Sequence, residues 1–156
     1  MTEIIKSDNL KLLKTDSDGY KYYVFNPTLL KQFPKSGNMR KMTFLQRGRF
    51  FAMKLHGYRV YLIGINDEVY SSIAFSGGGG YRFPFANKKD LIYGPSYTIP
   101  EYRGQGLAAR LGDAVIKEFE KDYENIYAAV KLTNEASLRC LEKNGYVKER
   151  RIGVNE

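Results

Sequence analysis

The chain has 156 residues, 43% of them hydrophobic, which suits one domain with a packed core and argues against disorder. It has no run of about 18 apolar residues and no signal-peptide pattern at its start, so we expect a cytoplasmic protein without a membrane span. Cys140 is the sole cysteine, which excludes an internal disulfide framework and a cysteine-based metal site. The net charge is +8, from 25 Lys and Arg against 17 Asp and Glu.

The basic residues are concentrated in one interval. No acidic residue occurs between Asp18 and Asp67, whereas nine Lys or Arg residues lie there, interleaved with ten aromatic ones. Such a stretch attracts a nucleotide-linked metabolite, a nucleic acid or a membrane surface, and the alternative is a solvated basic face. A nucleic acid is the least expected partner, because no RNA-recognition, helix-turn-helix or zinc signature accompanies the charge.

The first half of the chain predicts short strands and one helix. Aromatic and β-branched residues favour strands, and Asn-Asp between two such runs favours a hairpin. Four consecutive glycines, Gly77–Gly80, predict a mobile loop from Ser76 onward; no Gly-Lys-Ser/Thr follows, so this is not a P-loop. The expected elements are strands within 9–25 around a turn at 16–19, a helical turn at Thr28–Phe33, a helix at Met39–Leu55, and a hairpin of Arg59–Ile65 with Glu68–Phe75.

The stretch from Leu91 to Leu111 organises the rest of the chain. Leu91–Ile99 has the composition of a strand, and Pro100 stops it because proline cannot donate to a sheet ladder. A glycine turn at 103–106 then opens a helix. This helix carries one apolar stripe at four-residue spacing: Leu107, Leu111, Val115 and Phe119. A strand, a glycine turn and a helix start in this order can bind phosphate through free backbone N–H groups.

Three interpretations of the glycine turn compete. The first is an ordinary strand-to-helix turn. The second is a dinucleotide fingerprint, since Gly104, Gly106 and Ala109 satisfy G-x-G-x-x-A, but that fold needs the motif in its first strand–helix unit, and little chain follows here. The third is a pyrophosphate site, with Arg103 as a permanent cation beside it.

The C-terminal part predicts one strand, one helix and a last strand. The helix is expected to end at Gly145, a residue that commonly caps helices. Together the elements indicate a mixed α/β sheet with helices covering it, in one domain of residues 1–156. The expected elements are a strand at Asn125–Val130, a helix at Asn134–Asn144 and a strand at Tyr146–Val154.

Two motifs resemble those of the GNAT N-acetyltransferases. Arg103, Gly106 and Ala108 fill the fixed places of motif A, Gln/Arg-x-x-Gly-x-Gly/Ala. Asn134-Glu135-Ala136-Ser137, followed by Gly145-Tyr146, resembles motif B. The resemblance implies an α/β fold with a mixed, mostly antiparallel sheet, flanking helices and a splayed central strand pair. It also implies acyl transfer from acetyl-coenzyme A to an amine.

The resemblance further implies a set of cofactor-binding residues. The backbone of the central strand would pair with the pantetheine arm, the glycine turn would hold the pyrophosphate, and the last helix would contact the pantetheine from the far side. The implied residues are Ser96, Tyr97, Thr98, Arg103, Gly104, Gln105, Gly106, Leu107, Ala108, Ala109, Asn134 and Ser137. No metal is implied.

The catalytic residues stay open. Many members of the family carry a proton-donating tyrosine four residues before the helix-ending glycine, and here that place is Leu141. The candidates for its replacement are Tyr93, Ser96 and Tyr146, each of which also has a packing role as the alternative. The sole histidine, His56, is expected to cap a helix, and Cys140 is expected to be a small core residue.

The function predicted first is acetylation of a primary amine on a small anionic metabolite, such as an amino-sugar nucleotide, by direct transfer at a backbone oxyanion site. Acetylation of a protein or peptide amine is the alternative within the enzymes. A non-catalytic acyl-coenzyme A-binding domain is the alternative outside them, and Leu141 favours it. The oligomeric state is open, a homodimer included.

Overall fold

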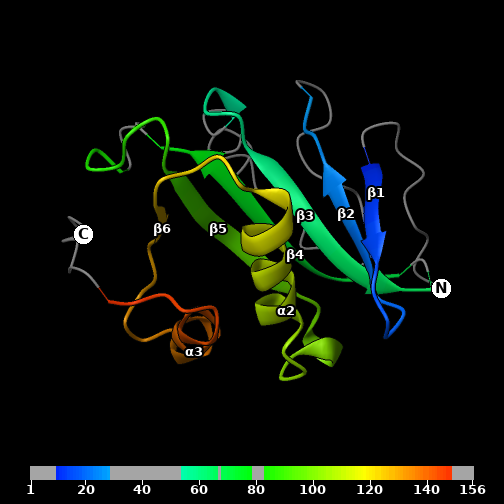
Figure 1. The fold of residues 1–156 in the computed structure, drawn as a ribbon. Helices are drawn as coiled ribbons and strands as arrows, with labels where there is room; N and C mark the ends of the chain where they lie inside the picture. Colours follow the sequence, from blue (N-terminus) through cyan, green and yellow to red (C-terminus); the bar gives the residue numbers. More distant parts are fainter. Residues whose placement is uncertain (1–9, 29–53, 67, 79–82, 149–156) are drawn as a thin grey trace.

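The computed structural model of the protein describes residues 10–28, 54–66, 68–78 and 83–148. Its centre is a six-stranded sheet whose strands lie side by side in their sequence order (Figure 1). The strands are β1 (Leu10–Thr15), β2 (Lys21–Phe25), β3 (Arg59–Ile65), β4 (Glu68–Gly77), β5 (Leu91–Thr98) and β6 (Ile126–Ala128). Every adjacent pair is antiparallel except β5 and β6, which are parallel. The predicted mixed, mostly antiparallel α/β fold is confirmed.

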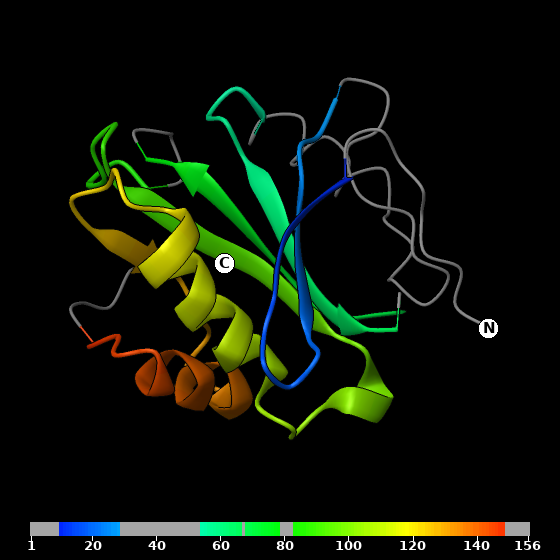
Figure 2. The same ribbon diagram turned by 45° about the vertical axis from the view of Figure 1, so that its right-hand side comes forward.

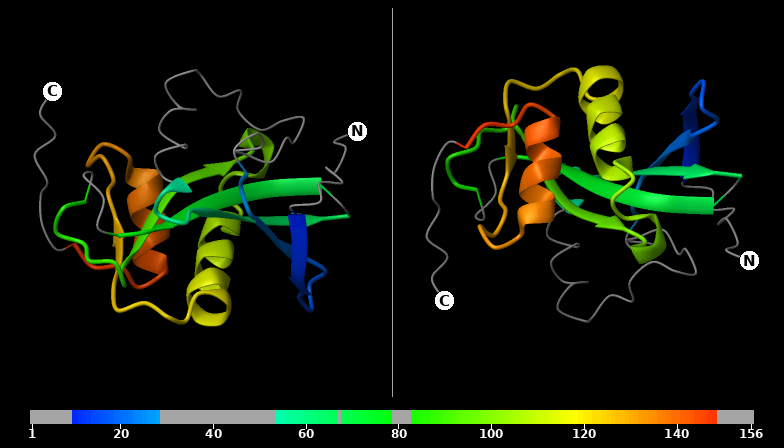
Figure 3. Two further views of the ribbon diagram at one scale, coloured as in Figure 1. Left: turned by 90° about the horizontal axis from the view of Figure 1, so that it is seen from above. Right: turned by 90° about the horizontal axis from the view of Figure 1, so that it is seen from below.

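The described residues form two α-helices that lie against or beside the sheet. Helix α2 (Leu107–Ala114) crosses one face, and α3 (Glu135–Lys143) lies beside it next to β5 and β6 (Figures 2 and 3). The helical turn expected at Thr28–Phe33, apart from Thr28 itself, lies outside the described residues, and so does nearly all of the helix expected at Met39–Leu55. None of the helices in the described ranges is long and apolar enough to cross a membrane.

The turns of the two hairpins confirm the predicted positions. Asp16 organises the first one, because its Oδ1 accepts hydrogen bonds from the backbone N–H groups of Asp18 (3.0 Å) and Tyr20 (2.9 Å). A side chain that binds the backbone two residues on is a common way to fix a turn. The second turn places Asn66 in the left-handed region at φ 49°, which asparagine tolerates better than most residues.

Strand β4 continues to Gly77, so the loop expected from Ser76 begins later than predicted. Local hydrogen bonds explain why β4 extends to Gly77. The Gly77 N–H donates to the backbone oxygen of His56 at 2.8 Å, and Ser76 and Gly77 pair with Ile92 and Leu91. Gly78 is then needed for close packing, since a Cβ there would lie 2.2 Å from the Asn87 carbonyl oxygen. His56 is exposed and contributes its carbonyl, as expected for a structural residue.

The apolar stripe of α2 fills the core between helix and sheet. Leu107, Leu111 and Val115 are buried there, and Phe119 packs against them at the edge. The α-helix itself ends at Ala114, and a π-helical turn carries the chain through Val115–Phe119. The wider turn keeps Phe119 on the core side, where its ring stacks on Tyr61 with centroids 6.0 Å apart. The predicted stripe is therefore confirmed, although the helix is not continuous.

A partly buried ion pair ties the end of the π-helical turn to the sheet. The Glu120 carboxylate accepts hydrogen bonds from Tyr61 Oη (2.6 Å) and Arg59 Nη2 (2.8 Å). Burial, with this carboxylate beside it, raises the pKa of Tyr61 well above its ordinary value. Arg59 belongs to the basic interval of the sequence, so one cation of that interval already has a carboxylate partner.

The C-terminal strand expected at Tyr146–Val154 is wrong where the structure describes it, because residues 146–148 form no strand. The Tyr146 N–H instead donates to the Leu141 carbonyl (3.1 Å) and the Gly145 N–H to the Glu142 carbonyl (3.0 Å). These two bonds, with Gly145 at φ 82°, are the Schellman motif that ends a helix. The predicted glycine cap is confirmed, and it uses the N–H that a strand would need. Residues 149–154 lie outside the described ranges.

Candidate active site

The site begins where β5 and β6 separate. Their parallel pairing covers three residues of β5, ending at Tyr93 opposite Ala128. Beyond Tyr93, Ser96, Tyr97 and Thr98 pair with β4, and no described strand pairs with their other edge. A central strand with one unpaired edge can accept hydrogen bonds from an extended ligand as if it were another strand.

The glycine turn lies directly after this edge. A 3₁₀ turn (Pro100–Tyr102) leads into Arg103, Gly104, Gln105 and Gly106, all of which are exposed. Gly104 and Gly106 have φ of 77° and 75°, values that only glycine adopts without strain. A Cβ on either residue would meet nothing within 4 Å. Backbone conformation, not crowding, therefore demands glycine, and open space lies in front of both residues.

Helix α2 starts at this turn without a side-chain cap. Gly106 is its N-cap residue, and the first intrahelical bond runs from Arg110 N–H to the Gly106 carbonyl at 2.9 Å. The N–H groups of Leu107, Ala108 and Ala109 come before Arg110 and therefore have no acceptor within the helix. These groups point out of the positive end of the helix dipole, an arrangement that suits an anion.

Arg103 is held against the end of β5. Its Nε donates to the Thr98 carbonyl at 3.0 Å, and its guanidinium lies 5.7 Å from the centroid of the Tyr97 ring. The structure thus brings together most of the predicted cofactor residues: the strand edge, Arg103 and the glycine turn are contiguous.

Asn134 and Ser137 lie on the other helix. Asn134 is the N-cap of α3, and its Oδ1 accepts from the Ser137 N–H at 3.3 Å. This bond gives Asn134 a structural task besides the predicted ligand contact, and its amide nitrogen is not used by the cap. Asn134 precedes α3 and Ser137 lies in its first turn, and α3 packs beside α2.

Asn144 joins the two helices, a role that the sequence analysis missed. Its Nδ2 donates to the Ala109 carbonyl in the first turn of α2 at 2.7 Å. A Cβ on Gly112 would lie 3.1 Å from Asn144 Oδ1, so glycine there allows the close approach. The only signal in the sequence was a polar residue directly before the helix-ending Gly145.

We expect Asn144→Ala to lower the free energy of unfolding by about 1–3 kcal/mol, because a partly buried carbonyl of α2 loses its donor. Urea denaturation measures this loss. Lys143→Ala is the matched control, since Lys143 is the exposed neighbour on the same helix and should change stability by no more than about 0.5 kcal/mol. Equal losses in both variants would contradict the assigned role.

Tyr93, Ser96, Cys140 and Tyr146 meet at the point where β5 and β6 separate. The Tyr93 hydroxyl lies near the side chains of Ser96 and Cys140, and its ring packs edge-on against Tyr146 with centroids 6.0 Å apart. The Tyr146 hydroxyl oxygen is buried and has no hydrogen-bond partner among the described residues. A buried hydroxyl without a partner is uncommon and indicates a place for a water or ligand atom.

Both tyrosines keep their hydroxyl protons at neutral pH. Burial raises the pKa of Tyr93 well above its ordinary value, and burial raises that of Tyr146 as well, with Tyr93 and Tyr123 nearby. Burial also raises the pKa of the Cys140 thiol, which keeps it protonated and a poor nucleophile. The expectation that Cys140 is a packing residue agrees with this environment.

Leu141 is buried, with 6% of its surface exposed. Leu141, at the position where the family resemblance implies a proton-donating tyrosine, therefore serves as packing in this chain. A larger side chain at this position would have to displace neighbours.

Comparison with known proteins identifies the family. The model of the acetyltransferase (GNAT) family matches residues 27–146. The chain belongs to this family. This match confirms the predicted resemblance, and the chain is an acetyltransferase of the GNAT type. No curated protein sequence matches the chain.

Solved structures share the GNAT fold at low sequence identity. An aminoglycoside acetyltransferase from an uncultured soil metagenomic sample, crystallised with trehalose, has a TM-score of 0.61 at 10% identity, covering 90% of this chain and 96% of that one. The aminoglycoside 6'-N-acetyltransferase AAC(6')-Ih from Acinetobacter baumannii has a TM-score of 0.55 at 16% identity, covering 74% and 81%. AAC(6')-Iy, in complex with the bisubstrate analogue CoA-S-monomethyl-acetylneamine, has a TM-score of 0.56 at 14% identity, covering 72% and 78%.

Proposed function

We propose that this GNAT protein transfers an acetyl group from acetyl-coenzyme A to a primary amine. The observation that carries the proposal is the unpaired edge of β5 leading directly into the glycine turn and the uncapped N-terminus of α2. An extended amide-containing arm fits the strand edge, and a pyrophosphate fits the helix start. Coenzyme A carries both groups in one molecule.

The residues present fit this cosubstrate. Ser96, Tyr97 and Thr98 would pair with the pantetheine arm through their backbone, and the N–H groups from Gly104 to Ala109 would hold the pyrophosphate. The exposed guanidinium of Arg103 would add charge at the same end. AAC(6')-Iy binds an analogue that joins CoA to an amine-bearing acceptor, which supports the same use of the shared fold.

The reaction places three demands on the chain. The amine must reach the site unprotonated, since an ammonium with a pKa near ~10.4 has no free electron pair. The carbonyl oxygen needs hydrogen-bond donors where negative charge develops, and N–H groups on the open edge of β5 can serve. The departing thiolate needs a proton, and we assign its donation to the Tyr146 hydroxyl, which has no other described partner.

The acceptor is proposed to carry phosphate or carboxylate groups, such as an amino-sugar nucleotide. Support comes from the sequence interval 19–66, which has no acidic residue. Arg59 of that interval is paired with Glu120, so its charge is already compensated within the protein. The aminoglycosides named for the similar structures are polycations, and the same interval would repel them.

Acceptor charge can be tested by competition of substrates. At low ionic strength, we expect anionic amines to be acetylated with kcat/KM about tenfold or more above that of polyamines and aminoglycosides, because like charges at the entrance reduce encounter. The preference should shrink as salt is added. Faster turnover of a polyamine or aminoglycoside at low salt would show that the charge argument is wrong.

The function itself is tested by release of free thiol from acetyl-coenzyme A in a panel of amines that includes sugar nucleotides, amino acids, peptides and aminoglycosides. Thiol release that depends on one class of amine supports the proposal and names the class. Release with peptides alone would favour a protein acetyltransferase. Tight CoA binding without release for any amine would favour a binding domain that has lost catalysis.

A further inference from the structure

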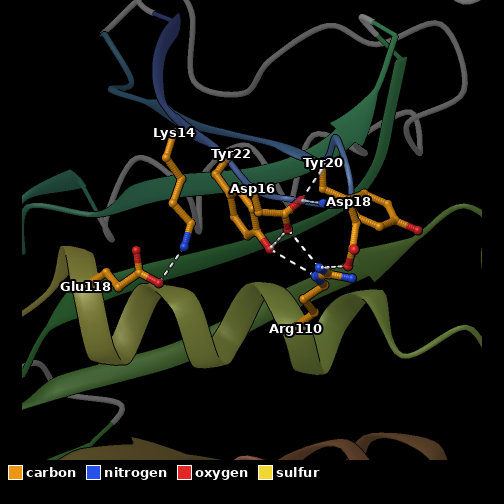
Figure 4. Close-up of polar contacts among 7 residues, drawn as sticks. All are labelled: Lys14, Asp16, Asp18, Tyr20, Tyr22, Arg110 and Glu118. Atoms are coloured by element: carbon orange, nitrogen blue, oxygen red, sulfur yellow. Dashed lines mark hydrogen bonds and ion pairs between the residues drawn. The ribbon is translucent and has the colours of Figure 1, made fainter.

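A cluster of five residues joins the β1–β2 hairpin to the first turn of α2. We call it the Arg110 cluster, and it consists of Asp16, Asp18, Tyr20, Tyr22 and Arg110 (Figure 4). The sequence analysis assigned no role to Arg110. Its side chain starts one helical turn after the Gly106 N-cap and, like other long helical side chains, covers the turn before its own Cα. The cluster therefore lies beside the proposed phosphate site.

The guanidinium of Arg110 has three polar partners and one aromatic one. Its Nη2 lies 2.9 Å from Asp16 Oδ2 and also bonds Asp18 Oδ2, and its Nε donates to Tyr22 Oη at 3.2 Å. The Tyr20 ring covers its face, with 4.6 Å from the guanidinium carbon to the ring centroid. Figure 4 shows the side chain directed from α2 toward the hairpin. This cation is thus fixed in place before any ligand arrives.

The two carboxylates differ in how firmly they belong to the fold. The Asp16 side chain is 14% exposed and organises the hairpin turn. Burial opposes its charge, but the hydrogen bonds from Tyr22 and the backbone, with Arg110, lower its pKa below the ordinary value. The Asp18 side chain is 59% exposed and bonds the guanidinium of Arg110 from the solvent side. Asp16 is therefore structural, whereas Asp18 can be changed with little cost to the turn.

Two carboxylates facing one guanidinium leave the cluster with a net charge of −1. Phosphate groups at the start of α2 would meet this charge at close range. Without Arg110, two uncompensated carboxylates would face them. Without the Asp18 charge, the cluster would be neutral. The strength of phosphate binding should therefore follow the charge of this cluster.

We propose that Arg110 is a positioning residue for the cosubstrate: it fixes the hairpin over the first turn of α2 and neutralises the hairpin carboxylates beside the phosphates of coenzyme A. Asp18 acts in the opposite direction and limits the affinity. This inference rests on the proposed function, since it concerns the phosphate end of the same site. Arg110 acts through the hairpin and the local field, and it need not touch the ligand.

A second contact between the β1–β2 hairpin and the helical segment provides a matched control. Lys14 of β1 bonds Glu118 at the other end of the helical segment (Figure 4). Glu118 lies eight residues after Arg110, about 12 Å further along at ~1.5 Å per residue. Lys14→Gln removes one positive charge between hairpin and helix, as Arg110→Gln does, but far from the phosphate end.

The test is calorimetric titration of each variant with CoA and with dephospho-CoA at low and high salt. We expect Arg110→Gln to weaken CoA binding about tenfold, Asp18→Asn to tighten it about two- to threefold, and Lys14→Gln to change it less than about twofold. The effects of Arg110→Gln and Asp18→Asn should be smaller for dephospho-CoA, which has fewer phosphate charges, and smaller at high salt. A purely structural role would change affinity for both ligands alike.

The alternatives give different results. Equal CoA binding by wild type and Arg110→Gln, or equal weakening by Lys14→Gln, would overturn this inference alone. Weaker binding in Asp18→Asn would also overturn it, and this variant keeps the test valid if Arg110→Gln fails to fold. A wild-type protein that binds neither CoA nor dephospho-CoA would instead refute the proposed function on which the inference rests.

Discussion

Gly106→Glu is expected to raise the Kd for CoA by about 100-fold or more, because a carboxylate would occupy the helix N-terminus that the pyrophosphate needs. A Cβ at Gly106 meets nothing within 4 Å, so the new side chain would extend into the open space of the site and displace no packed group. The residue is exposed, and the core behind it begins only at Leu107. Calorimetry with CoA measures the loss.

Backbone strain must be separated from this effect. Gly106 has φ 75°, so any other residue there costs about 1–2 kcal/mol of stability. Gly106→Ala carries the same strain with a small uncharged side chain and is the matched control. We expect similar melting temperatures for the two variants and less than about tenfold weaker CoA binding for alanine. Wild-type affinity in the glutamate variant would remove the phosphate site from the glycine turn.

Tyr146→Phe is expected to lower kcat by about 10²-fold or more, within the range that general acid catalysis contributes. The change removes one hydroxyl that is buried without a described partner and keeps the ring that packs on Tyr93. The affinity for CoA should stay unchanged, since the hydroxyl is assigned to the departing sulfur only. Thiol release across pH, with the amine identified by the screen, measures the effect.

Tyr93→Phe is the control for Tyr146→Phe, because it removes the neighbouring hydroxyl, which lies near Ser96 and Cys140, and keeps the Tyr146 hydroxyl. Its kcat should fall by less than about tenfold. Leu141→Tyr, which restores the tyrosine of similar enzymes, should not accelerate turnover, since position 141 is buried and a larger ring there costs about 1–3 kcal/mol through crowding. A tenfold gain in Leu141→Tyr, or full activity in Tyr146→Phe, would refute the assignment of the proton donor.

The sequence predicted the features that depend on local pattern. The hairpin turns at Asp16 and Asn66, the apolar stripe from Leu107 to Phe119 and the Gly145 cap all follow from residues close together in the chain. The glycine turn before α2 was also predicted, because positive φ at Gly104 and Gly106 is a local demand. The motifs that led to the family lie in the same segments.

Features that depend on contacts across the chain were not predicted. The π-helical turn at 115–119 places Phe119 against Tyr61, which belongs to strand β3 and lies far away in the sequence. The strand expected from Tyr146 is absent in 146–148 because its N–H completes the cap of α3. In the sequence, Asn144 and Arg110 look like ordinary polar residues of helices. Asn144 acquires its role from Ala109, and Arg110 acquires its role from Asp16 and Asp18.

The order of the strands has a consequence for how the protein folds. Each described strand pairs with the strand next to it in sequence, and none is inserted between two earlier ones. Such a sheet can grow by adding one strand at a time as the chain is synthesised, and proteins rich in contacts close in sequence fold fast. The bond from Arg110 to Asp18 spans 92 residues and closes one of the long loops. We therefore expect the strands from β1 onward to pair first, with docking of α2 onto the first hairpin as the late step that sets the folding rate.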